Sequence, residues 1–123
     1  MIARMWHGVT LAENSEAFLK YMKNTGIKTC IDADGNRGVY VLRRPGNAQV
    51  DFIFLSFWES YESIRNFAGQ NIGKPLYFPD DEKYLIELEQ EVKHYEVLFE
   101  QVSSAPGKTK YLLKSFLAYI FKV

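Results

Sequence analysis

The fold can be inferred outward from one segment, Phe52-Ile-Phe-Leu-Ser-Phe-Trp58. Large apolar side chains occupy both its odd and its even positions, whereas a strand with one wet face alternates apolar and polar residues. It therefore predicts a strand over residues 50–59 that is covered on both sides. A second strand is predicted over residues 38–44, and the turn Pro45-Gly46-Asn47 between the two indicates a β-hairpin.

The residues that precede this hairpin predict a strand and a helix. Residues 2–10 are rich in large apolar side chains and predict the first strand. Thr10 and Glu13 have the spacing of a capping box, so we expect a helix to begin there, or alternatively at Asn14 or Ser15, and to end at Gly26. Residues 27–36 are predicted to be a connection that ends in a turn.

The residues that follow the hairpin predict a helix, a second helix and a last strand. Ser60 can cap a short helix that ends at Gly69. The acidic run over residues 80–82 suits the start of the next helix, and residues 84–88 supply its apolar stripe. Residues 92–99 predict the final strand.

This order of elements is that of a split βαβ, ferredoxin-like α+β fold with an antiparallel four-stranded sheet. In such a fold the helices cover one face of the sheet. Because the strand over residues 50–59 is apolar on both sides, something else has to cover the other face. A second copy of the chain is the simplest cover, so the sequence predicts a homodimer.

Composition excludes several classes of protein. The chain has 15 basic and 15 acidic side chains, which disfavours binding to nucleic acid through bulk charge. A single cysteine, Cys30, excludes an internal disulfide and a zinc site built on several cysteines, and it fits a reducing cytoplasm. The sequence contains no apolar run of about 18–20 residues that would span a bilayer.

Charge divides the chain into two unlike parts. Residues 1–100 carry 11 basic and 15 acidic side chains, net −4, whereas residues 101–123 carry four lysines and no acid, net +4. We therefore predict one domain over residues 1–100 and a basic, apolar extension over residues 101–123. Residues 108–123 could form an amphipathic helix on an anionic membrane, although docking on this subunit or its partner is the favoured alternative.

Five segments occur in order along the first 100 residues: Met1-Ile-Ala-Arg-Met-Trp-His-Gly8, Gly38-Val-Tyr-Val-Leu-Arg-Arg44, Phe57-Trp-Glu-Ser60, Ile64-Arg-Asn-Phe-Ala-Gly69 and His94-Tyr-Glu-Val97. Through these segments the sequence resembles the antibiotic biosynthesis monooxygenase (ABM) domain family over residues 1 to about 100. The resemblance implies a dimeric α+β barrel, with a small-molecule cavity between sheet and helices in each subunit.

The resemblance also implies an activity. Some members of the family oxidise aromatic or phenolic substrates with O2 and need no cofactor, so none is expected here; a non-catalytic ligand-binding or structural dimer is the alternative. Related haem-degrading proteins combine an Asn on the first strand, a Trp that ends the third, and a His ten residues later. Trp58 matches that Trp, but His7 stands near the Asn position and Ala68 at the His position. Haem binding by that pattern is therefore disfavoured.

His7 and His94 are the candidate catalytic bases. Each has an ordinary pKa of about 6.5, and both are expected on neighbouring strands, where they could face one pocket. Hydrogen-bonded packing is the alternative for each. Trp58, Tyr40 and Tyr95 are candidate pocket residues, although a place in the core is the favoured alternative for Trp58.

Other polar residues also have simpler roles open to them. Arg4, Arg43 and Arg44 could pair with a carboxylate of a substrate, but a solvated or interfacial arginine is the default. Cys30 has no partner base in its surroundings in the sequence, and no metal-ligand spacing is present, so neither a catalytic thiol nor a metal site is predicted.

Overall fold

The computed structural model describes residues 1–103 of the chain. Its strands are β1 (Ile2–Leu11), β2 (Asn36–Arg44), β3 (Gln49–Trp58) and β4 (Lys93–Glu96), and its α-helices are α1 (Ser15–Asn24), α2 (Gly26–Asp32), α3 (Tyr61–Ala68) and α4 (Asp81–Tyr84). A 3-10 turn over Ala12–Asn14 joins β1 to α1. The interpretations of residues 108–123 as a membrane-surface or docked helix lie outside the described residues.

The four strands form one antiparallel sheet in the order β2-β3-β1-β4. The central pair is long, because β1 and β3 remain in register from Ile2 opposite Trp58 to Leu11 opposite Gln49. This order and these directions confirm the ferredoxin-like α+β fold. Within residues 1–103, no helix is long and apolar enough to cross a bilayer.

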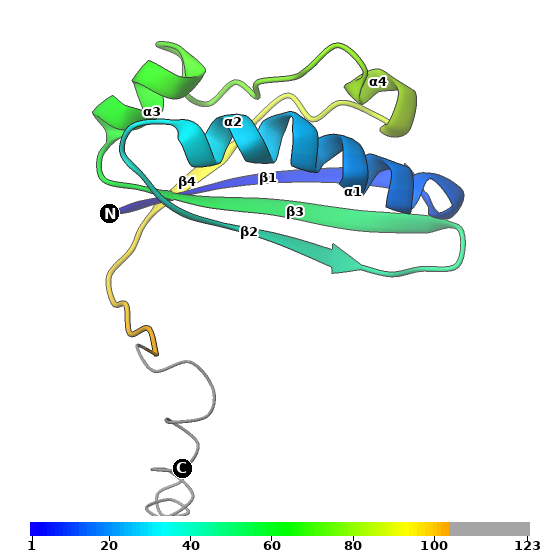
Figure 1. Ribbon diagram of the computed structural model, residues 1–123, viewed down its shortest axis with the longest axis horizontal. Coiled ribbons are helices and arrows are strands. Elements are labelled where there is room, and N and C mark those ends of the chain that lie inside the picture. Colours follow the sequence, from blue (N-terminus) through cyan, green and yellow to red (C-terminus); the bar gives the residue numbers. More distant parts are fainter. Residues whose placement is uncertain (104–123) are drawn as a thin grey trace, which may run out of the picture.

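The helices of the described chain all lie on one face of the sheet (Figure 1). Trp6 of β1 packs against Phe18 of α1, with ring centroids 6.3 Å apart, so the even-numbered side chains of β1 point toward the helices. By the strand register, the same is true of the even-numbered residues of β3. We call this side of the sheet the helix face and the opposite side the open face.

Two apolar clusters on the helix face form the core. One is built around Phe18, Met22 and Phe52 and continues to Leu85 beyond α4. The other cluster lies where the start of β1 pairs with the end of β3, and it consists of Ile2, Cys30, Trp58 and Ile64. Together they fix α1, α2 and α3 against the sheet.

Several local predictions are confirmed. The side chain of Ser60 accepts a hydrogen bond from the backbone N–H of Ser63, which caps α3, and the helix ends at Gly69. Gly35 lies in the predicted turn before β2 with a φ of +87°, in the left-handed region that favours glycine. An added Cβ there would overlap the Cβ of Ser63, so the turn packs directly on α3.

Other local predictions are wrong. Thr10 does not cap a helix: it is a fully buried residue of β1, because the β1–β3 ladder continues past it, and α1 begins only at Ser15. Residues 27–36 are not merely a connection, because α2 occupies Gly26–Asp32. The helix predicted from the acidic run is a single turn that ends at Tyr84, because Leu85 is extended and bridges Thr10 of β1.

Candidate functional site

Two adjacent pockets lie between the sheet and the helices, each with a volume of about 60 Å³. Trp6 and Phe54 form the sheet-side wall of both, and Leu76 and Phe78 of the loop after α3 form the outer wall. The first also contains Arg4, and we call it the Arg4 pocket. The second contains Asp81, and we call it the Asp81 pocket.

A break between two helices makes room for both pockets. Thr25 has φ −123° and ψ −92°, which is outside the helical region, and it separates α1 from α2. Gly26 lines both pockets, and a Cβ added there would lie 3.4 Å from the ring of Phe54. A side chain at position 26 would therefore narrow the space between the helices and β3.

Arg4 is the charged group of the first pocket. Its residue surface is only 6% exposed, so the prediction of a solvated arginine is wrong for this position. One guanidinium nitrogen, Nη1, donates to the carbonyl oxygen of Ile72 at 2.7 Å and lies 3.0 Å from Nε2 of His94. Burial lowers the pKa of Arg4, but an arginine remains protonated in proteins.

His94 of β4 lies opposite Arg4 on the helix face. Because a guanidinium only donates hydrogen bonds, Nε2 of His94 is the acceptor and its lone pair is engaged. Burial, and then the charge of Arg4, lower the pKa of His94 below its ordinary 6.5, so the ring is neutral at pH 7. His94 therefore orients Arg4, and it can take a proton at Nε2 only after that hydrogen bond breaks.

Neutral polar groups complete the Arg4 pocket. Cys30 of α2 and Ser56 of β3 both line it. Burial raises the pKa of the Cys30 thiol to about 11, against the opposing effects of Ser56 and Arg4, so the thiol is uncharged at neutral pH. The amide of Asn36 lies 3.4 Å from the Cys30 sulfur and donates to it.

Trp58 is a core residue that supports the pocket from behind. It is fully buried, and it lines neither pocket. Its indole Nε1 donates to Oγ of Ser56 at 2.9 Å, and its ring lies 4.9 Å from that of Phe67. Its contribution to the site is to hold Ser56 and Phe67, which do line the Arg4 pocket.

Asp81 brings a buried carboxyl group to the second pocket. The residue is 7% exposed, and its Oδ2 accepts a hydrogen bond from the backbone N–H of Phe78 at 2.6 Å. Burial raises the pKa of this carboxyl, an effect that outweighs the opposing hydrogen bond from Phe78. A carboxyl with a raised pKa beside aromatic walls is a candidate acid or base.

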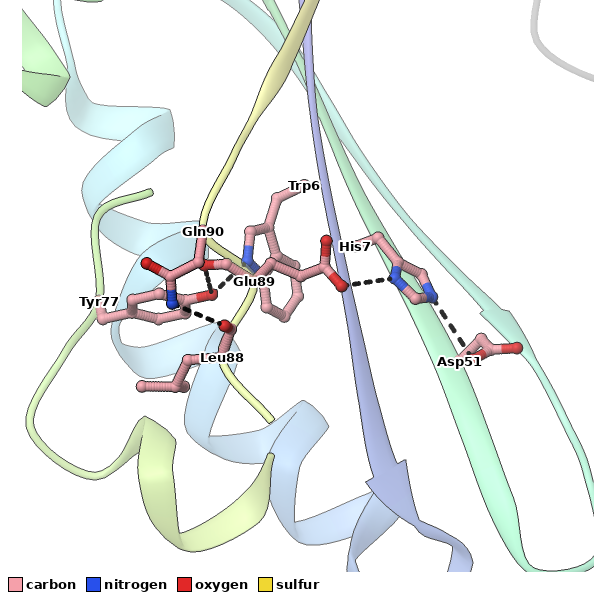
Figure 2. A network of polar contacts seen from close by, with 7 residues as sticks. All are labelled: Trp6, His7, Asp51, Tyr77, Leu88, Glu89 and Gln90. Atoms are coloured by element: carbon pink, nitrogen blue, oxygen red, sulfur yellow. Dashed lines mark hydrogen bonds and ion pairs between the residues drawn. The ribbon is translucent and has the colours of Figure 1, made fainter. Parts of the chain in front are cut away.

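Two hydrogen bonds link Trp6 of β1 through Tyr77 to Glu89 (Figure 2). Nε1 of Trp6 donates to the hydroxyl of Tyr77 at 3.0 Å, and that hydroxyl donates to the backbone carbonyl of Glu89 at 2.9 Å. Burial raises the pKa of Tyr77, so the phenol is protonated at neutral pH. These bonds hold the Trp6 ring in the wall that both pockets share.

The two histidines do not share a pocket. His7 follows Trp6 on β1 and points to the open face, where its side chain is 39% exposed (Figure 2). Nε2 of His7 lies 3.4 Å from Asp51, and Nδ1 lies 3.4 Å from Glu89. The expectation of a common pocket is therefore wrong, because the register of β1 and β4 places His7 and His94 on opposite faces.

Both tyrosines that were predicted to line a pocket, Tyr40 and Tyr95, also lie on the open face. Tyr40 of β2 is 63% exposed and Tyr95 of β4 is 48% exposed. Their registers place them opposite Leu55 and Ala3, both of which point away from the helices. Neither tyrosine lines the Arg4 pocket or the Asp81 pocket.

Sequence reasoning undervalued two residues of the site. For Arg4 a signal was present, since it alternates with Ile2 and Trp6 and must share their face of β1. Asp81 gave no such signal, because an acidic residue at the start of a helix is ordinarily exposed. Its side chain turns inward to bond the backbone of Phe78.

The comparison with solved structures shows which proteins share this fold. A Bacillus cereus protein described as a candidate antibiotic biosynthesis monooxygenase superposes with a TM-score of 0.58, at 16% identity, over 85% of this chain and 97% of that one. The chain has the fold of an antibiotic biosynthesis monooxygenase. A variant of MhuD, another protein of this ABM-like fold, superposes with a TM-score of 0.53 at 13% identity, over 84% of this chain and 100% of that chain. No family model and no curated protein sequence matches.

The residues on the ABM-like helix face do not fit a haem. The MhuD variant was solved with two manganese protoporphyrin IX molecules in each active site. Pockets for drug-sized ligands measure about 300–1,000 Å³, whereas the two pockets here measure about 60 Å³ each. The one histidine on this face, His94, has its Nε2 engaged by Arg4, and within residues 1–103 no cluster of side chains could hold a metal ion.

Proposed function

We propose that this protein binds a small aromatic or phenolic molecule on the helix face of the sheet and oxidises it with O2, without a resident cofactor. One observation supports this most strongly. A pair of pockets with aromatic walls lies in an ABM-like fold and holds a buried carboxyl, that of Asp81. Aromatic walls suit a flat apolar ligand, and a carboxyl of raised pKa suits proton transfer.

The chemistry needs little from the protein. An acidic substrate such as anthrone loses a proton from its CH2 group, and the resulting carbanion supplies the electrons that reduce O2. The CH2 becomes a carbonyl, and the second oxygen atom leaves as water, so the atoms balance without another reductant. The protein has to bind the substrate, accept its proton and exclude bulk water.

The proton acceptor is assigned by position. His7 lies on the open face, away from both pockets, and Nε2 of His94 already accepts the hydrogen bond from Arg4. Asp81 lines the second pocket directly. We therefore place Asp81 first as the general base, followed by His94 and then His7.

Entry of a substrate requires movement of the outer wall. An apolar cavity of about 150 Å³ is needed to hold one benzene ring, which exceeds either pocket alone. Leu76, in the wall common to both, is 42% exposed and belongs to the helix-free loop between α3 and α4. Displacement of this loop would both join and enlarge the two pockets without breaking the sheet.

Oxygen uptake tests this function. We expect the chain to consume O2 with anthrone, and the Asp81→Asn variant to be slower by about 10²–10⁴-fold, the usual contribution of a general base. Because ionised Asp81 is the active form, the rate should rise with pH through a pKa above the ordinary 3.8 of an aspartate. The measurement is uptake at an oxygen electrode across this pH range.

The control for this experiment is Asp80→Asn, which removes a neighbouring, half-exposed carboxylate that pairs with Lys83. It should leave the rate within about twofold of the unchanged protein. A double substitution of His7 and His94 by alanine tests the two histidines. If Asp81→Asn is fully active while the histidine variant is inactive, the base is misassigned; if no anthrone is oxidised, the activity is refuted.

We also propose that a second copy of the chain covers the open face. The partly buried side chains Met5, Ile53, Leu55 and Phe57 gather there, together with the exposed Tyr40 and Leu42. Among residues 1–103 no helix lies over this face (Figure 1). A contiguous apolar face of this kind is typical of an interface.

A non-catalytic ligand-binding dimer is the alternative function. The small volume of the two pockets supports it, because a ligand that fills such a pocket leaves no room for O2 beside it. Binding of an aromatic ligand without oxygen uptake would favour this alternative.

A further inference from the structure

The Arg4 guanidinium is a buried cation that faces a pocket. Its residue surface is 6% exposed, and it lines the Arg4 pocket beside Cys30 and Ser56. Burying a charge is costly unless an opposite charge or several hydrogen bonds compensate for it. The partners of Arg4 therefore indicate what its pocket lacks.

Arg4 has only uncharged partners in the part of the chain that the structure describes. Its two hydrogen bonds, to the carbonyl oxygen of Ile72 and to Nε2 of His94, both come from Nη1. No carboxylate of residues 1–103 forms an ion pair with it. An arginine also donates from Nε and Nη2, and no partner among these residues receives those donors. The guanidinium thus has donors to spare.

Arg43, which forms an ion pair with Glu16, provides a comparison for Arg4. Its Nη1 lies 2.6 Å from the carboxylate of Glu16 and 3.1 Å from the hydroxyl of Ser15, at a half-exposed position. Arg4 is more deeply buried, yet it has no such carboxylate. Nor can the walls of its pocket supply an anion, because the Cys30 thiol is protonated at neutral pH. Asp81 belongs to the neighbouring pocket.

We propose that the Arg4 pocket, once displacement of its outer wall has enlarged it, binds a small aromatic carboxylate, with its carboxylate group on the Arg4 guanidinium and its ring against Trp6, Phe54 and Phe78. The planar fork of a guanidinium matches a carboxylate in two parallel hydrogen bonds. His94 and the Ile72 carbonyl hold Nη1 and so orient that fork. This inference rests on the proposed small-molecule site and specifies the charge of its ligand.

Calorimetric titration of the full chain with benzoate and with benzamide tests the proposal. The two probes have nearly the same shape, but only benzoate carries a negative charge. A hydrogen bond to a charged group contributes enough that benzoate should bind at least about tenfold more tightly. Arg4→Met should abolish this preference, whereas Arg44→Met, which removes an exposed arginine of β2, should retain it.

Each outcome of the titration either supports or overturns the proposed carboxylate site. Equal affinity for the two probes in the unchanged protein, or a preference for benzoate that survives Arg4→Met, overturns the proposal. If Arg4→Met does not fold, Arg4→Lys keeps the charge without the fork and should reduce the preference. Binding of neither probe overturns both the pocket and this inference. Preferential binding of benzoate without oxidation of anthrone supports the inference and refutes only the proposed activity.

Discussion

Replacement of Trp58 by alanine is expected to lower the free energy of unfolding by about 3–5 kcal/mol, the usual cost of removing a large aromatic side chain from a core. Trp58 is fully buried, its ring lies 4.9 Å from that of Phe67, and its indole donates to Ser56. The substitution removes all of these contacts and leaves a cavity beneath the Arg4 pocket. Urea denaturation at a fixed protein concentration measures the loss.

Trp58→Phe is the matched control for that experiment. It keeps an aromatic ring against Phe67 and loses the hydrogen bond to Ser56, so it should cost less than half as much as alanine. A loss below about 1 kcal/mol for Trp58→Ala would contradict a core role. If Trp58→Ala costs so little stability but abolishes ligand binding, Trp58 lines a pocket and is not a core residue.

Replacement of Leu55 by aspartate is expected to convert the proposed dimer to monomers and to raise its dissociation constant by at least about 100-fold. Leu55 is at the centre of the open face, opposite Met5 on β1 and Tyr40 on β2. A carboxylate at this position would be buried without a partner in the interface, which is costly. Sedimentation velocity at micromolar concentrations measures the mass.

The control is Ile31→Asp, the same kind of change at a 57% exposed position of α2, on the other side of the sheet. It should leave the mass of the dimer unchanged. An unchanged chain that sediments as a monomer, or a Leu55→Asp variant that remains dimeric, would contradict a dimer built on the open face.

The sequence predicts much of the fold because local patterns and tertiary contacts agree. The structure contains three features that the sequence predicts locally. They are strand β3 at the apolar run, the cap of α3 at the Ser60 hydroxyl and the turn at Gly35. Thr10 shows the opposite case. Its spacing to Glu13 suits a helix cap, but pairing of β1 with β3 along ten residues outweighs one capping bond.

The site is harder to predict because it depends on strand register. A shift of one residue moves a side chain to the other face of a sheet. His94 lies on the helix face because it is opposite Arg4, and no pattern in the sequence states that pairing. His7, Tyr40 and Tyr95 lie on the open face for the same reason. The Asp81 side chain points inward because its carboxylate accepts a hydrogen bond from the backbone of Phe78, a contact that no sequence pattern indicates.

The two tryptophans of the chain allow a test of whether a small molecule binds on the helix face. Trp6 lines both pockets, whereas Trp58 lines neither. In a 15N NMR spectrum each indole N–H gives one signal, and Trp6→Phe assigns the pair. We expect added benzoate to shift the Trp6 signal to saturation and the Trp58 signal much less. A Trp6 signal that does not move, or two signals that drift equally without saturating, would contradict a ligand site in these pockets.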